Sequence, residues 1–225
     1  MELTFYAHAS FRLVADDVAI ITDPYQPGPE GSGFAPIDEP ADLVIMSSTT
    51  DRFHADPSHI RGDPTIVDAL ALPPEGMTVQ GVPIRPFPAM ENLNHDFGRD
   101  PDANAMYLFT VGGVRVLHLG DIGNPIPPEQ LAALEGQVDV LLALAGGRAT
   151  IALDDLDAAI AAIGPRVIIP MHYYSPRGVL KILPVGEFLA RQPVETIVRV
   201  GGPRLTLTPE TLPATPQIYL LEQSR

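Results

Sequence analysis

The apolar run Leu43–Met46 is bounded by polar residues and is followed directly by the polar segment Ser47–His54. Four apolar residues in succession, at this length, predict a strand that is buried on both faces. Strands of this kind belong to α/β architectures, in which ligands and catalytic groups gather beyond the carboxyl ends of the strands. The sequence therefore predicts that residues 47–54 lie at a functional edge of a sheet.

Apolar runs and helical patterns alternate along the rest of the chain, without the composition shift that marks a linker. Three short runs at the N-terminus predict an antiparallel meander, and later strands alternate with helices. We therefore predict one layered α/β domain over residues 1–225. Strands are expected at 3–7, 11–14, 18–22, 43–46, 65–67, 105–110, 114–119, 138–144, 167–169, 197–200, 205–207 and 218–221, helices at 127–134, 153–163 and 185–191, and long loops at 26–40 and 86–103.

Composition excludes several classes of function. The chain has no cysteine, so disulfides, thiolate metal ligands and cysteine nucleophiles are all excluded. A net charge of −14 argues against nucleic acid and anionic membranes as partners, because both require a basic surface. No stretch approaches the roughly 20 apolar residues of a membrane span, and the N-terminus lacks the pattern of a signal peptide. We expect a cytoplasmic protein.

Polar residues that could carry chemistry follow several of the predicted strands. Each such residue alone is weak evidence, because histidine and aspartate often close a strand as turn residues. Their combination and order along the chain are more specific. The motifs are Tyr6–Phe11 (YAHASF), Ile21–Pro24 (ITDP), the segment Ser47–His54 (SSTTDRFH), Asn104–Tyr107 (NAMY), His118–Asn124 (HLGDIGN) and Ile169–Tyr173 (IPMHY).

In this order the motifs resemble those of the metallo-β-lactamase fold, in its ascorbate-6-phosphate-lactonase-like branch of metal-dependent hydrolases. The resemblance implies a four-layer αββα sandwich with the site where these strands end. It also implies two metal ions, such as zinc or manganese, that generate a hydroxide nucleophile and polarise the scissile bond. It places Asp121 at the bridging aspartate and His172 at the last histidine. Either His95 or Glu91 falls at the third-motif position.

The chain departs from this family at its main histidine motif. When Ser47 is aligned with the family's serine, the two histidines, the aspartate and the final histidine of the motif are replaced by Ser48, Thr50, Arg52 and Phe53. Hydroxyl groups are poor ligands for a divalent ion, and a phenylalanine ring is none. We therefore expect a site without metal or other cofactor.

The arginine in this motif suggests how the fold could tolerate the loss. The Arg52 guanidinium is always protonated, and it could replace the lost cations by pairing with Asp121. A buried carboxylate needs such a partner. The histidine that the family carries after its GDLG motif is also absent, and Asn124 stands there instead.

The other polar residues near these motifs have both structural and functional interpretations. Asp51 and His54 flank the lost ligands, and we expect them to face water, with a rearranged metal site as the alternative. His8 and His118 are expected to be core or supporting histidines whose ring nitrogens are hydrogen-bonded. Asp23 is expected to organise the loop that follows its strand.

Three functions are compatible with these residues. The leading hypothesis is a non-catalytic descendant whose cleft, which includes Tyr173, binds a small anionic molecule through donors on Ser48, Thr50, Arg52 and His172. The alternative is a lactone or phosphoester hydrolase with zinc or manganese in a rebuilt site. That site would use some of Asp51, His54, His95, Asp121 and His172. A third hypothesis is a structural scaffold that acts as a homo-oligomer.

Overall fold

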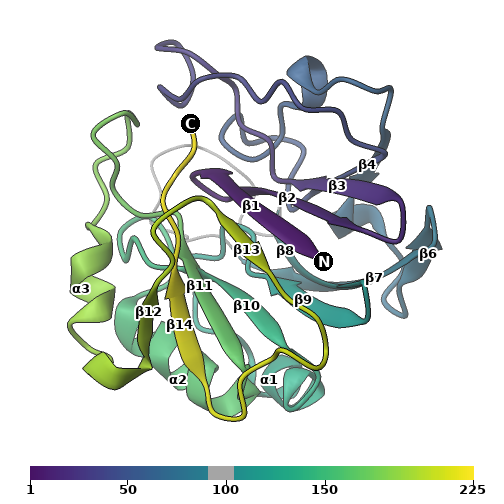
Figure 1. The fold of residues 1–225 in the computed structure, drawn as a ribbon. Helices are drawn as coiled ribbons and strands as arrows, with labels where there is room; N and C mark the ends of the chain where they lie inside the picture. Colours follow the sequence, from purple (N-terminus) through teal and green to yellow (C-terminus); the bar gives the residue numbers. More distant parts are fainter. Residues whose placement is uncertain (91–103) are drawn as a thin grey trace.

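The N-terminal apolar runs form the predicted meander, which extends into a six-stranded mixed sheet (Figure 1). The computed structural model describes residues 1–90 and 104–225. Asp16 and Asp17 join the second and third strands with φ angles of 51° and 63°, as a type I′ hairpin turn requires. In spatial order the strands are β13 (Arg204–Thr206), β1 (Glu2–Ala7), β2 (Ser10–Ala15), β3 (Val18–Thr22), β4 (Leu43–Met46) and β5 (Thr65–Asp68).

The second sheet is also mixed and has eight strands. Its central strands run parallel, so their carboxyl ends meet at one edge. The spatial order is β12 (Ile197–Arg199), β14 (Gln217–Leu220), β11 (Val167–Met171), β10 (Val140–Leu144), β9 (Val114–His118), β8 (Asn104–Val111), β7 (Val82–Ala89) and β6 (Met77–Val79).

Alternation along β4 shows how the first sheet is buried on both faces. Leu43 and Ile45 point into the core between the sheets, where they join buried residues of the second sheet. Val44 and Met46 point to the opposite face and belong to a second apolar cluster. That cluster is completed by the loop 24–42 and by residues around the 3₁₀ helix η1 (Pro57–His59), and its loop members include Tyr25, Phe34 and Ile37.

The α-helices of the described residues all lie in the second half of the chain (Figure 1). They are α1 (Pro128–Leu134), α2 (Leu153–Ile163) and α3 (Val185–Leu189), and each buries apolar side chains in the core of the second sheet. The predicted two-sheet fold is thus confirmed. The outer face of the first sheet, however, is covered by loop 24–42 where the αββα expectation places helices. No helix in the described ranges has the length and apolarity to cross a bilayer.

The strand β7 extends to Ala89 and so enters the segment 86–103, which the sequence predicted to be a loop. Pro86 and Pro88 lie within this strand and align with Tyr107 and Ala105 of β8. β6 pairs only with residues 82–84, so the following part of β7 has β8 as its one paired neighbour. Proline lacks an N–H donor and is tolerated at such an edge position.

A partly buried ion pair between Arg115 of β9 and Asp139, which precedes β10, provides a test of the packing. Asp139 accepts hydrogen bonds from the backbone N (2.9 Å), Nε (3.0 Å) and Nη2 (2.9 Å) of Arg115. Burial raises the pKa of Asp139, but the hydrogen bonds from Arg115 outweigh it and hold the pKa below its usual value. We expect Asp139→Asn to lower the free energy of unfolding by about 1–2 kcal/mol at pH 7, measured by urea denaturation.

The pH dependence of stability shows whether the charge of Asp139 or only its shape stabilises the protein, because asparagine keeps the shape without the charge. Since the folded-state pKa of Asp139 is lowered, its contribution is complete above the unfolded pKa of about 3.9 and is lost as the pH falls through the folded value. The difference between wild type and Asp139→Asn should therefore be constant from pH 7 to about pH 5 and shrink below about pH 4. Glu222→Gln, an exposed acid-to-amide change, is the control. A difference that persists at pH 3 would contradict the ion-pair explanation.

Candidate metal centre

Five strands of the two sheets end at a common edge and place polar side chains there. His8 follows β1, Asp23 follows β3, and the polar loop that ends at His54 follows β4. Asp121 and His172 follow β9 and β11 of the second sheet. All five side chains are buried, and the predicted convergence of the strand ends is therefore observed.

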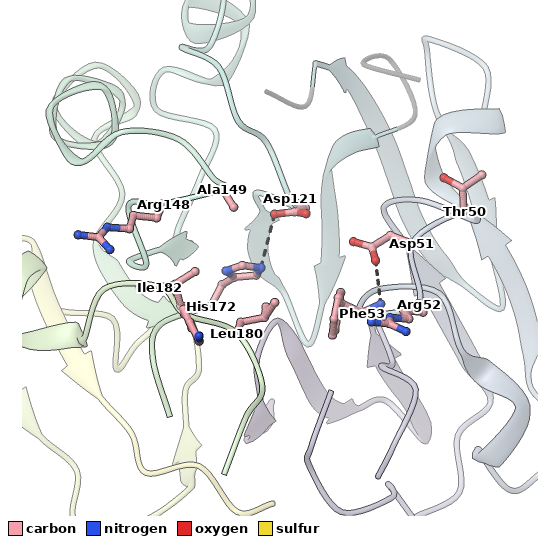
Figure 2. Close-up of a pocket in the computed structure, with 11 residues that line it drawn as sticks. Thr50, Asp51, Arg52, Phe53, Asp121, Arg148, Ala149, His172, Leu180 and Ile182 are labelled. Carbon is pink, nitrogen blue, oxygen red and sulfur yellow. Dashed lines mark hydrogen bonds and ion pairs between the residues drawn. The ribbon is translucent and has the colours of Figure 1, made fainter. Parts of the chain in front are cut away.

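The centre of this cluster is His54, which the sequence analysis expected to face water. Its ring is fully buried, and its Nε2 lies 3.7 Å from Asp121 Oδ2 and 4.0 Å from Asp51 Oδ2. His172 Nε2 lies 3.5 Å from Asp121 Oδ1 (Figure 2). Asp51, also expected to face water, is only 6% exposed. Both expectations were wrong, and the alternative of a rearranged site describes these residues better.

Asp23 fixes the orientation of the His54 ring. Its Oδ2 lies 2.8 Å from His54 Nδ1, and the same carboxylate accepts hydrogen bonds from Ser47 N (2.8 Å), Ser47 Oγ (2.6 Å) and Tyr107 OH (3.0 Å). With Nδ1 held by Asp23, Nε2 is directed at Asp51 and Asp121. A histidine whose second nitrogen is bound by a carboxylate is the usual arrangement behind a metal-ligating imidazole.

His8 and His172 stand beside His54 with their rings close together. The ring centroids of His8 and His172 are 4.0 Å apart, and those of His8 and His54 are 4.8 Å apart. His118 fulfils the expectation of a satisfied core histidine, because Nε2 lies 2.8 Å from Ala9 O and Nδ1 accepts from Gly120 N. His8 does not, since its buried Nε2 has no hydrogen-bond partner among residues 1–90 and 104–225.

Three of the clustered residues have strained backbones. His8, Asp23 and His172 have φ angles of 58°, 37° and 51°, in the left-handed region that residues other than glycine rarely adopt. The two strand ends also support each other, because His172 N donates to His8 O at 2.7 Å. Strain of this kind persists where the surrounding structure enforces it, and it concentrates at functional sites.

The charges of the three histidines differ because their surroundings differ. Burial lowers the pKa of His54, but the carboxylates of Asp121, Asp23 and Asp51 outweigh it and raise the pKa to about 9. Burial and the neighbouring His54 lower the pKa of His172 to about 3. Burial and the other histidines lower the pKa of His8 in the same direction. His8 and His172 are therefore neutral, the form in which imidazole binds metal.

Two overlapping groups of residues meet the requirements of a metal site within the described part of the chain. One is His8, His54 and His172, and the other is Asp51, His54 and Asp121. In each group, one ligand atom per residue lies within 4.8 Å of the others. Both groups contain His54.

A family model described as the beta-lactamase superfamily domain matches residues 2–172. The chain belongs to the beta-lactamase superfamily. A UPF0173 metal-dependent hydrolase of Thermococcus onnurineus is 27% identical over 199 residues, which are 77% of this chain and 84% of the relative. A relative of the same description from Carboxydothermus hydrogenoformans is 26% identical over 193 residues, with the same coverage.

Solved structures share the fold of this chain. A candidate Zn-dependent hydrolase of the metallo-beta-lactamase superfamily from Thermotoga maritima superposes with a TM-score of 0.75 and 29% identity over 99% of both chains. A metal-dependent hydrolase candidate from Parabacteroides distasonis gives a TM-score of 0.64 at 21% identity, over 84% of this chain and 86% of the other. The predicted superfamily is confirmed, whereas the lactonase-like branch stays a prediction.

The predicted ion pair between Arg52 and Asp121 is wrong. The Arg52 side chain is exposed, donates to Glu30 O at 3.2 Å, and stacks on the Phe53 ring at 5.0 Å. The cause is a local turn, in which Asp51 accepts from Phe53 N through its side chain and from His54 N through its carbonyl. The turn brings Asp51 and His54 to the same side and directs Arg52 away. The protonated ring of His54 supplies the positive charge next to Asp121 that was predicted to come from Arg52.

The remaining predicted site residues are spread around the cluster. Ser48 is buried and lies 3.2 Å from Thr50 through their hydroxyl groups, while Thr50 is exposed at the outer side of the pocket (Figure 2). Tyr173 is half-buried, and its hydroxyl donates to Leu221 O at 3.5 Å. Glu91 and His95 lie outside the described residues.

The support from Asp23 can be tested without any ligand. Asp23→Asn replaces an acceptor of four hydrogen bonds with an amide that cannot accept from all of them, and it removes the charge next to His54. We expect the free energy of unfolding to fall by about 3 kcal/mol or more, measured by urea denaturation. Asp63→Asn, at an exposed position with the left-handed backbone that asparagine tolerates, should change it by less than about 0.5 kcal/mol. Equal stability of the two variants would show that Asp23 carries no structural role.

Proposed function

We propose that this protein is a metal-dependent hydrolase with a rebuilt centre for one divalent ion, zinc or manganese. Asp51, His54, Asp121 and His172 would hold the ion. The observation that carries this proposal is the orientation of His54: Asp23 binds its Nδ1, and its Nε2 is directed at two buried carboxylates. The names of the relatives agree with this class of reaction.

The spacing of the side chains fits such an ion. In a tetrahedral zinc site with ligands about 2.0–2.2 Å from the ion, the ligand atoms lie about 3.4 Å from one another. The separations of 3.5, 3.7 and 4.0 Å around Asp121 and His54 are close to this value. Small side-chain rotations would bring these atoms to the separations that the ion requires. Mixed imidazole and carboxylate ligands suit both zinc and manganese.

The two groups of ligands together favour one ion and not two. Each contains His54, and the Nδ1 of that histidine is already bound by Asp23. Only Nε2 is left to bind metal, and a ring nitrogen has one lone pair for one ion. A second ion would therefore have to do without His54. The positions at which the family implies further histidines are occupied by Ser48 and Thr50.

A divalent ion in this centre would supply Lewis acidity toward a carbonyl or phosphoryl oxygen and let water act as a nucleophile near neutral pH. The residues of the chain itself position the ligands of the ion and shield the site from water. The Asp23–His54 hydrogen bond fixes the tautomer of the ligand. A cavity of about 460 Å³ opens onto Asp121 and His172, and Phe53 and Ile182 form part of its apolar wall. This setting suits hydrolysis of a lactone or phosphoester.

The hypothesis of a metal-free, non-catalytic descendant has no support in the structure. It rested on the loss of ligands at residues 48, 50, 52 and 53. The structure replaces part of that loss with Asp51 and His54, which the same loop turns inward. The expectation that no cofactor binds is likewise unsupported.

Metal content tests the proposal. The protein is stripped with a chelator, incubated with zinc or manganese, desalted and analysed for bound metal. We expect about one ion per chain, and less than about a tenth of that in His54→Ala and Asp121→Ala, because each variant lacks one of the four proposed ligands. Hydrolysis of a panel of lactones and phosphodiesters should be lost in the same variants.

The matched control is His59→Gln, which changes a histidine outside the cluster that hydrogen-bonds to Tyr25 O and Ile37. It should keep the full metal content. Wild-type protein that binds no metal after this treatment would contradict the proposed function. Two ions per chain would contradict the single centre.

A further inference from the structure

The pocket that opens onto the metal centre carries positive charge at its mouth, against the balance of the whole chain. The protein has 28 acidic and 14 basic residues, yet Arg52, Arg148 and Lys181 all line this one pocket. Lys181 is the only lysine in the sequence. A cluster of cations on a strongly acidic protein creates a local field that attracts an anion.

Arg148 and Lys181 are available for such a ligand. Both side chains are exposed, and neither forms an ion pair with a residue in the described ranges. Arg115, Arg191 and Arg225, in contrast, are each paired with carboxylates of the chain. Arg52 is partly engaged by Glu30 O and Phe53.

The two segments that carry these cations are fixed to each other and to the metal centre. Leu183 N donates to Gly146 O at 2.8 Å, which joins the segment of Lys181 to the loop of Arg148. A Cβ added at Gly146 would lie 2.2 Å from His172 O, so the loop packs directly on the backbone of a proposed ligand. The backbone segments that carry Arg148 and Lys181 are therefore fixed relative to Asp121 and His172.

The pocket has three zones of different character (Figure 2). Asp121 and His172 lie at its inner end, and the Arg148 guanidinium points away from them toward the outside. Ile182 is drawn between Arg148 and His172, and Leu180 and Phe53 add apolar surface to the lining. A molecule that fills this pocket must present an apolar part to the middle zone and a group of opposite charge to the cations.

We propose that the substrate is an amphipathic anion. Its carboxylate or phosphate group binds Arg148 and Lys181 at the mouth, its apolar body contacts Leu180 and Ile182, and its hydrolysable bond lies beside Asp121 and His172. This inference rests on the proposed function only for the last of these statements. Arg148 and Lys181 are specificity residues, and they bind the charged end of the substrate and not its reacting atoms.

The test measures binding with simple probes, so that it does not depend on turnover. Hexanoate and pentyl phosphate are titrated against metal-loaded wild-type protein by calorimetry, with hexanamide, which has the same pentyl chain, as the uncharged comparison. We expect both anions, or one of them, to bind at least about tenfold more tightly than hexanamide. The stronger of the two identifies the carboxylate or the phosphate as the recognised group.

The double variant Arg148→Gln and Lys181→Gln should weaken binding of the preferred anion by about tenfold or more and leave hexanamide unchanged. Arg204→Gln, an exposed arginine on β13 outside this pocket, is the matched control and should bind the anion as wild type does. Metal content is measured on the same samples and should be the same in all variants.

These readouts separate the two proposals. Anions that bind no more tightly than hexanamide, or that bind the double variant as well as wild type, would overturn the assignment of Arg148 and Lys181 while the metal centre stands. Anion binding that depends on these residues, in wild-type protein that takes up no zinc or manganese after the treatment described above, would support the anion site and contradict the proposed hydrolase.

Discussion

The hydrogen bond between the buried carboxylate of Asp23 and Nδ1 of His54 is the contact on which the rest of the site depends. Asp23 ends a strand of the first sheet, and Tyr107, which also donates to it, belongs to the second sheet. The carboxylate therefore joins the two sheets at the edge where the functional side chains gather. A buried charge is tolerated only when its hydrogen-bonding capacity is used, and Asp23 accepts from three different residues.

This contact also determines what the neighbouring carboxylates can do. With Nδ1 engaged, the Nε2 of His54 is the only group of that ring that Asp51 and Asp121 can meet. Three carboxylates and three histidines then share a small volume from which water is largely excluded. Such an arrangement is costly unless a cation is present at its centre. The His54 imidazolium can supply that charge, and so can a divalent ion bound to the neutral ring.

Much of the fold could be predicted from the sequence because its elements are signalled locally. The bounds of Leu43–Met46 and of helix Leu153–Ile163 were predicted to the residue, since apolar runs and helical periodicity need no knowledge of distant partners. The extension of β7 through Pro86 and Pro88 was missed. Whether a proline is tolerated there depends on which neighbour pairs with the strand, and this is a property of the sheet and not of the segment.

The candidate site was predictable only in part, for the same reason. Asp121 and His172 were found because they stand in well-matched motifs at strand ends. His54 was named only in the alternative of a rebuilt site, because counting along the motif without a gap assigned the ligand positions to Arg52 and Phe53. The turn at Asp51 changes which side chains face inward, and it is fixed by hydrogen bonds from Phe53 N and His54 N. The inward-facing Asp51 and His54 each stand one residue away from Arg52 and Phe53, to which the count had assigned the ligand positions.

Under the proposed function, this chain departs from its family by having a smaller metal centre and not by having lost it. Ser48 and Thr50 stand where the family implies histidine ligands, and among the described residues His8 is the further imidazole close to His54 and His172. Asp51 and His54 stand beside Asp121 and His172 and retain what a single ion requires: imidazole and carboxylate ligands, a fixed tautomer and a buried setting. Because both candidate groups of ligands contain His54, whose Nε2 can bind only one ion, they cannot both be filled through that ring, and this agrees with the proposed single ion.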